Sequence, residues 1–194
     1  MLPKIEDVRR KFRNPPIGEV SNWFQKPCTV WAELSVPVVA VVQGFCIGAG
    51  LQLALGADFR FGDPTTRMSI MESRWGLIPD MGITQTLPKL MRADQAKKFM
   101  MTAEMITAEN ALRAGLLTET CDDPMTRAQE FLVGVSLKSP NAIAGCKSLV
   151  EKTWGMPAGD RLRIEAEIQA ELIGSPNQME AVMAGMAKRK PKFT

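Results

Sequence analysis

The sequence predicts an α/β fold, with a parallel sheet in the first part of the chain and helices in the rest. Three observations support this fold class. A β-branched run spans residues 36–42, a glycine-rich turn leads from it into a helical pattern, and a further strand pattern follows at 57–62. Strands that alternate with helices are typical of parallel sheets. With 194 residues, 45% of them hydrophobic, the chain can bury a sizeable core.

The elements of the sheet region follow in order. Residues 1–34 predict brief helices and loops, because four prolines interrupt them. The run Val36–Val42 is continuously apolar, so it predicts a strand buried on both faces. We then expect a loop at 43–48, a helix at 49–56, and strands at 57–62 and 67–71, the last ending at Glu72.

The pattern becomes helical from residue 82 onward. Thr107 is placed to cap a helix that Gly115 ends, and "ETCDD" after it is typical of a strand end and turn. Two later helices begin with Ser-Pro, a cap followed by proline at the first helical position. The later helices that we expect cover about 124–138, 140–152, 157–173 and 176–187. We therefore expect a core at 1–123 and a helical region at 124–194.

Composition excludes several classes of function. The net charge of +3 is too small to argue for nucleic acid, and no run reaches the roughly 18 apolar residues of a membrane helix. The charged N-terminus lacks the apolar segment of a signal peptide. We expect a cytoplasmic protein with no nucleic-acid or membrane partner. The four cysteines show no CxxC spacing and are interpreted as reduced, mostly buried side chains.

The absence of histidine limits the available chemistry. It excludes Ser-His and Cys-His nucleophiles and zinc sites that contain histidine. Acid–base chemistry near neutral pH must then use Asp, Glu, Lys or Cys. Because no histidine can activate Cys46, a small buried cysteine is favoured there over a nucleophile.

The stretch "QGFCIGAGLQLALGAD" at 43–58 is the first candidate site. Its glycines let the backbone approach a ligand closely, and the first N–H groups of the following helix lack internal partners. Together with the helix dipole they favour a phosphate or an oxygen that becomes negative. Neither GxxxxGK[ST] nor GxGxxG matches. An oxyanion site or a tight turn that only permits close packing both stay open.

The stretch "MESRWGLIPDMGIT" is the second candidate site, with carboxylates at Glu72 and Asp80. The residues between them are mostly apolar, and an acid held in an apolar wall has the raised proton affinity of a base that works near neutral pH. The alternative is structural. Glu72 would pair with Arg67 or Arg74, and Asp80 would cap the helix that starts near Gly82.

The two stretches, in this order, resemble the enoyl-CoA hydratase/isomerase (crotonase) superfamily. The resemblance runs through "PVVAVVQGFCIGAGLQLALGADFRF", "MSIMESRWGLIPDMGITQTLPKL" and "ITAENALRAGLL", and "MAKRKPKFT" is similar to the family's ending. It implies a crotonase-like ββα spiral fold, an acyl-CoA thioester as ligand, and a homotrimer or hexamer. It also implies that 124–194 serves trimerisation and closure of the acyl-CoA pocket.

The resemblance assigns roles to single residues. The backbone N–H of Ala49 holds the thioester oxygen, and Glu72 is the main acid–base residue. Asp80 stands where dienoyl-CoA isomerases carry an aspartate, and Gln52 stands where hydratases carry a second glutamate. The substrate-binding residues that we expect are Phe45, Cys46, Ile47, Gly48, Gly50, Gln52, Trp75, Leu77, Pro79, Gly82 and Ile83.

Two departures from the family pattern matter. An amide at Gln52 cannot take a proton, so water addition by two carboxylates is impaired while a double-bond shift is not. The family also carries an early motif resembling A-F-[SC]-A-G-x-D, which supplies the second oxyanion N–H and grips CoA. Nothing similar occurs in residues 1–42. We therefore expect an N-terminally incomplete core.

The sequence as a whole predicts an enoyl-CoA isomerase. Glu72 is the leading base, Asp80 delivers or removes the second proton, and Gln52 orients the substrate or a water. No metal and no cofactor beyond the coenzyme A of the substrate is expected. One alternative is an enoyl-CoA hydratase that uses Glu72 alone. The other is a truncated, non-catalytic remnant that binds acyl-CoA or acts as an assembly subunit.

Overall fold

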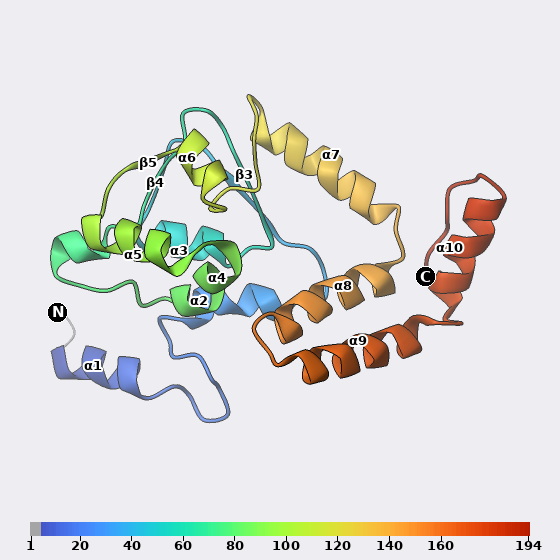
Figure 1. The fold of residues 1–194 in the computed structure, drawn as a ribbon, viewed down its shortest axis with the longest axis horizontal. Coiled ribbons are helices and arrows are strands. Elements are labelled where there is room, and N and C mark those ends of the chain that lie inside the picture. Colours follow the sequence, from blue (N-terminus) through green and yellow to red (C-terminus); the bar gives the residue numbers. More distant parts are fainter. Residues whose placement is uncertain (1–4) are drawn as a thin grey trace. The chain divides into compact units, whose positions relative to one another are not determined.

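The computed structural model describes residues 5–194, and these residues form two compact units (Figure 1). Residues 5–33 and 38–125 form the first unit, which contains the strands found in the described residues. Residues 34–37 and 126–194 form the second unit, which is helical. Each unit is described by itself below.

The first sheet of the first unit is entirely parallel. It consists of β1 (Val39–Val42), β3 (Phe59–Gly62) and β6 (Glu119–Thr120), in the order β1-β3-β6. Val39 pairs with Phe59, and Phe61 pairs with Glu119. The predicted alternation of strand, helix and strand is therefore confirmed, and so is the strand at "ETCDD".

The first predicted strand was too long and too deeply buried. β1 begins at Val39, and Val36, which is 58% exposed, belongs to the second unit. Within β1 only Val42 is fully buried, and the other three residues are half-buried. The reason is that β1 pairs with β3 along one edge alone in the described part of the chain, so its other edge is not covered by a strand.

One strand of the second sheet lies in a stretch that was predicted as a loop, and another confirms a shorter form of the strand predicted at 67–71. The sheet consists of β2 (Phe45–Ile47), β4 (Arg67–Ser69) and β5 (Ile106–Thr107), with β2 parallel and β5 antiparallel to β4. The loop expected at 43–48 is therefore wrong, because β2 runs between Gly44 and Gly48, both at positive φ. Three residues between two glycines are too short to show a strand period.

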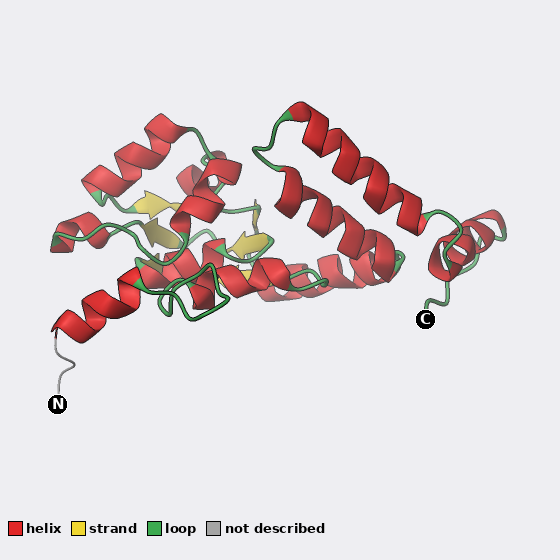
Figure 2. Cartoon of the chain, turned by 90° about the horizontal axis from the view of Figure 1, so that it is seen from below, coloured by secondary structure: helices red, strands yellow, loops and turns green. Residues whose placement is uncertain are grey.

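Helices surround the strands of the first unit (Figure 2). The predicted helix at 49–56 is confirmed as α3, and Thr107 caps α6 by accepting a hydrogen bond from the Asn110 N–H at 3.4 Å. Gly115, at φ 82°, follows the end of α6 as expected. The helices are α1 (Ile5–Arg13), α2 (Lys26–Thr29), α3 (Ala49–Leu55), α4 (Ile83–Leu90), α5 (Ala93–Thr102) and α6 (Ala108–Arg113), with short 3-10 helices η1 (Val30–Glu33) and η2 (Glu72–Trp75).

The core of the first unit joins the second sheet to the helices that cover it. Leu51 of α3, Met68 of β4 and Ala111 of α6 are completely buried within it. Beside this core, the buried Arg60 side chain donates to the carbonyl oxygens of Leu116 (2.8 Å) and Ala57 (2.7 Å). These bonds satisfy a guanidinium group that would otherwise be costly to bury.

Four helices follow from residue 124, as predicted. Two of them begin with the expected serine caps: Ser139 accepts from the Ala142 N–H and Ser175 from the Gln178 N–H, each at 3.4 Å. The helices are α7 (Pro124–Ser136), α8 (Pro140–Thr153), α9 (Ala158–Leu172) and α10 (Pro176–Met186).

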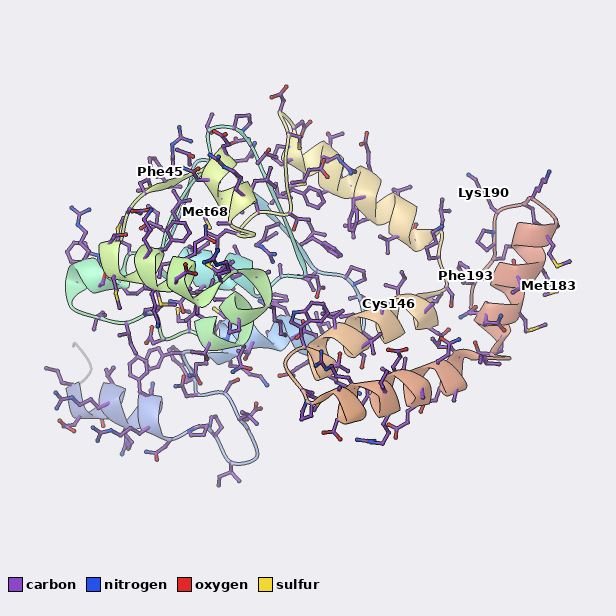
Figure 3. All side chains as sticks on the ribbon, in the orientation of Figure 1. Phe45, Met68, Cys146, Met183, Lys190 and Phe193 are labelled. Carbon is purple, nitrogen blue, oxygen red and sulfur yellow. The ribbon has the colours of Figure 1, made fainter. Side chains whose placement is uncertain are left out.

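In the second unit, α8 packs closely on α9, and hydrogen bonds hold the C-terminal residues against α10. A Cβ at Gly145 of α8 would lie 3.2 Å from Ile168 of α9, so the missing side chain lets the two helices approach. The Asn177 amide of α10 donates to Asn141 of α8 (2.7 Å) and accepts from the Thr194 N–H (3.0 Å). Figure 3 shows Met183 pointing away from α10 into solvent, where it is 51% exposed.

Within residues 5–194, no helix combines the length and the apolar character that crossing a membrane requires.

We predict that the core depends strongly on the inner face of α3. Leu51→Ala removes a fully buried side chain and should lower the free energy of unfolding by about 2–5 kcal/mol. Leu53 lies on the same helix but is 45% exposed, so Leu53→Ala is the matched control and should cost under about 1 kcal/mol. Urea unfolding followed by circular dichroism measures both. Equal losses would mean that α3 does not pack as described.

Candidate active site

A sharp turn at Gly48 brings two strand ends together. Gly48 follows β2 with φ 54° and ψ −122°, a backbone conformation that side chains disfavour. Its N–H donates to the Ser69 carbonyl oxygen at 2.9 Å, where β4 ends. Because β2 and β4 are parallel, with Ile47 opposite Ser69, the segments that leave both strands start from the same edge.

The first turn of α3 presents uncapped backbone N–H groups. The residue before the helix is Gly48, which has no side chain to cap it. The first helical bond runs from the Gln52 N–H to the Gly48 carbonyl at 3.0 Å, so the N–H groups of Ala49 and Gly50 have no partner within the helix. Both residues are exposed. Unpartnered N–H groups at the start of a helix favour a nearby negative charge.

Glu72 lies over this turn. It is the first residue of η2, three residues after β4, and so not at a strand end as predicted. Its Oε1 is 3.5 Å from the position that a Cβ on Gly48 would take. Its Oε2 is buried and has no hydrogen-bond partner. Oε1 is therefore the carboxylate oxygen that lies beside the turn.

The arginines that were offered as structural partners of Glu72 bond elsewhere. Arg67 donates to the backbone oxygens of Pro64, Thr65 and Thr66, at 2.9–3.2 Å. Arg74 lies over the Trp75 ring, 5.8 Å from its centroid. The alternative of a Glu72–arginine pair is therefore not what holds this carboxylate.

Gln52 joins three segments of the site. Its Nε2 donates to Glu72 Oε1 at 2.7 Å, and its Oε1 accepts from the backbone N–H of Met81 at 2.8 Å. The side chain is 2% exposed. The amide thus connects α3, η2 and the loop before α4. Sequence reasoning found Gln52 and Glu72 but missed Met81, because a backbone donor leaves no signal in a side-chain pattern.

Asp80 lies in the same loop and is half-buried. It does not cap α4, whose N-cap is Gly82 with no side-chain hydrogen bond, so that alternative is wrong. Burial raises the pKa of Asp80. Burial, helped by the charge of Asp80, raises the pKa of Cys28 to about 11. In the described part of the chain, no hydrogen bond joins Asp80 to Glu72.

The residues that were expected to bind substrate divide into two groups. Phe45, Trp75 and Leu77 are exposed by 65% or more, and Phe45 appears on the strand beside that of Met68 in Figure 3. The others are partly or fully buried, apart from the exposed Gly50: they are Cys46, Ile47, Gly48, Gln52, Pro79, Gly82 and Ile83. Trp75 and Leu77 follow Glu72 closely in the sequence. Cys46 and Ile83 instead belong to the core.

A family model described as enoyl-CoA hydratase/isomerase matches residues 17–194. The chain belongs to the enoyl-CoA hydratase/isomerase family. The enoyl-CoA hydratase of Bacillus anthracis has the same fold, with a TM-score of 0.88 over 98% of this chain and 71% of that one, at 23% identity. This likeness confirms the predicted crotonase-like fold.

Two family relatives differ in the reaction that they are named for. The short-chain-enoyl-CoA hydratase of Clostridium acetobutylicum is 30% identical over 159 residues, which are 81% of this chain and 61% of the relative. The peroxisomal Delta(3,5)-Delta(2,4)-dienoyl-CoA isomerase of Arabidopsis thaliana is 28% identical over 194 residues, with 97% of this chain and 66% of the relative covered. The chain thus spans less than two thirds of each of these two relatives.

We predict that the Gly48 turn tolerates no side chain. Gly48→Ala forces alanine into a conformation that costs about 1–3 kcal/mol, and should lower the free energy of unfolding by that amount. Gly50, two residues on, has open space around its Cβ position and no positive φ. Gly50→Ala should therefore change stability by less than about 1 kcal/mol, in the stabilising direction. Thermal unfolding of the two variants side by side checks this.

We predict a specific pH dependence at Asp80. The pKa of Asp80 is raised above the ordinary 3.8 in the folded protein, so folding favours the protonated form of this carboxyl group. The protein is therefore most stable, as far as Asp80 is concerned, below pH 3.8, and loses stability as the pH rises through the pKa of the folded state. Asp80→Asn should therefore be more stable than the wild type at pH 7, with the difference closing as pH falls towards 3.8.

Asp63 provides a control of opposite sign for Asp80. Bonds from Thr65 and Thr66 lower the pKa of Asp63, so Asp63→Asn should be the less stable protein at pH 7. Chemical unfolding at several pH values measures both differences. If the difference in free energy of unfolding between Asp80→Asn and the wild type is the same at every pH, the environment of Asp80 does not disfavour its charge.

Proposed function

We propose that the chain is an enoyl-CoA isomerase that shifts a double bond through a thioester enolate. The observation that supports this most is the placement of Glu72. Its unpartnered, buried Oε2 belongs to a carboxylate beside Gly48, directly before the free N–H groups of α3. A thioester whose oxygen accepts the Ala49 N–H would present its adjacent carbon to this carboxylate.

The chemistry follows from this pairing. Donation from the Ala49 N–H to the thioester oxygen stabilises the negative charge of an enolate, and thereby acidifies the carbon next to the carbonyl. Glu72 then removes a proton from that carbon. Return of a proton two carbons further along the chain completes the shift of the double bond. One proton leaves the substrate and one returns to it, so the reaction consumes no water and no cofactor beyond the coenzyme A of the substrate.

Asp80 is proposed as the group that carries the second proton. Its raised pKa suits a carboxyl that holds a proton under conditions where an exposed aspartate would not. It lies one residue before Met81, whose N–H is bonded to Gln52, and so it is in the segment connected to Glu72. The exposed Trp75 and Leu77, with Pro79, are proposed to contact the acyl chain.

A hydratase is the second candidate. The Clostridium relative is named as a hydratase, which favours this reading. In this chain, Gln52 offers an amide where a second carboxylate would be needed to activate water, so hydration would depend on Glu72 alone. A non-catalytic acyl-CoA-binding subunit is the third candidate. The proposed assembly in all three cases is a homotrimer or hexamer, in which 124–194 serves trimerisation and closes the pocket.

The sign of an absorbance change separates the first two candidates. Moving the double bond of a 3-enoyl-CoA next to the thioester creates a conjugated chromophore, whereas hydration of a 2-enoyl-CoA destroys one. We expect conjugation to appear with the 3-enoyl-CoA faster than it disappears with the 2-enoyl-CoA. Faster loss from the 2-enoyl-CoA would establish the hydratase. If no acyl-CoA binds in a titration calorimeter, both catalytic candidates fail.

We predict that Glu72→Gln lowers turnover by about 10²–10⁴-fold while the affinity for CoA thioesters is kept. The substitution preserves the shape of the side chain and an oxygen that can accept from Gln52, and removes only the capacity to take a proton. Glu109→Gln is the matched control, because Glu109 is exposed on α6 and paired with Arg113. Turnover that survives Glu72→Gln would show that another group is the base.

A further inference from the structure

The orientation of the Gln52 amide is fixed by its two partners. The Met81 N–H can only donate, so the atom that faces it at 2.8 Å must be the amide oxygen. The amide nitrogen is then the atom that faces Glu72 Oε1 at 2.7 Å. Since the side chain is 2% exposed, both bonds are made in a buried environment. Gln52 is therefore anchored at both ends to protein groups.

This anchoring makes the two oxygens of Glu72 inequivalent. Oε1 accepts the Gln52 bond and lies beside Gly48, while Oε2 is buried without a partner. The Gln52 amide can donate to Oε1 whether or not the carboxyl group carries a proton, because both oxygens of a carboxylic acid can accept a hydrogen bond. The Gln52 bond is thus compatible with both protonation states, so the carboxyl need not turn during the reaction.

We propose that Gln52 is a positioning residue that holds the Glu72 carboxyl group beside the Gly48 turn, where it exchanges protons with substrate. This rests on the proposed function of Glu72. In the step itself, the C–H bond next to the thioester carbonyl breaks and an O–H bond forms on the Glu72 carboxyl group. The electron pair moves into the enolate, whose charge rests on the thioester oxygen, and a proton is returned to the more distant carbon. Gln52 neither gives nor takes a proton in this sequence.

An amide fits this task better than a carboxylate at the same position. Two ionised carboxylates 2.7 Å apart repel each other, so a glutamate at position 52 could hold Glu72 only by sharing a proton with it. An amide donates at every pH at which the protein is folded. The position of the Glu72 carboxyl group then does not depend on the titration of a second group at position 52.

The test uses Gln52→Met, which keeps the length of the side chain and loses both hydrogen bonds. We expect kcat for the 3-enoyl-CoA to fall by about 10²-fold, because displacing a reacting group by about 1 Å costs this much. KM should stay within about threefold, because no contact with the thioester is removed. Gln85→Met is the matched control, since Gln85 is exposed on α4, and it should leave both constants unchanged.

A second variant covers the case in which Gln52→Met does not fold. Gln52→Glu retains an acceptor for the Met81 N–H but can donate to Glu72 only when it carries a proton. Its kcat relative to the wild type should therefore rise as pH is lowered. A merely structural role of Gln52, in holding the Met81 loop, would give no such trend. A kcat ratio that is flat with pH in Gln52→Glu would count against the positioning role.

Failure of this inference is distinguishable from failure of the proposed function. If Glu72→Gln abolishes turnover while Gln52→Met keeps kcat within about threefold of the wild type, the positioning role is wrong and the function stands. If the wild type turns over none of the enoyl-CoA substrates, or Glu72→Gln is fully active, the proposed function fails and the role of Gln52 fails with it.

Discussion

The parallel pairing of β2 with β4 is the constraint on which the rest of the site depends. Two parallel strands end at the same edge, so the chain leaves both of them towards one region. From β2 it turns at Gly48 into α3, and from β4 it continues into η2. An antiparallel pairing would have placed Glu72 at the far end from the helix. The bond from the Gly48 N–H to Ser69 fixes the register at this point.

The site retains an unfavourable feature that the core has to offset. Glu72 Oε2 is buried with no partner, and an unsatisfied buried polar atom costs about 1–3 kcal/mol. The fully buried Leu51 and Met68, on the elements that carry the site, contribute stabilisation of the same order. Unsatisfied buried polar atoms are rare in native proteins and can mark a functional group, which is consistent with the role proposed for this carboxylate.

The fold could be predicted largely from sequence because its signals are local. Serine caps mark α8 and α10, the glycine-rich stretch marks α3, and the motifs together indicate the family. The failures have physical reasons as well. β2 is three residues long, too short to show a period, and the burial of β1 depends on whether a neighbour covers its second edge. Neither property is encoded in the strand's own residues.

The candidate site was predicted in its side chains but not in its connections. Gln52 and Glu72 could be found by residue type and order, whereas their mutual bond and the Met81 N–H depend on how three segments meet. Asp80 shows the same limit. Its spacing from Glu72 suggested a pair of acids, yet no hydrogen bond joins the two carboxyl groups in the described part of the chain. Sequence spacing across a turn does not determine which way a side chain faces.

The burial of Cys46 prevents a side reaction between its thiol and an acyl-CoA. Cys46 lies in β2, two residues before the Gly48 turn, and burial raises its pKa to about 11. A thiolate close to an activated thioester would attack its carbonyl carbon, release CoA and leave the acyl group attached to the cysteine. A thiol that stays protonated at neutral pH is a poor nucleophile. The same packing that completes the core therefore keeps this sulfur inert towards an acyl-CoA.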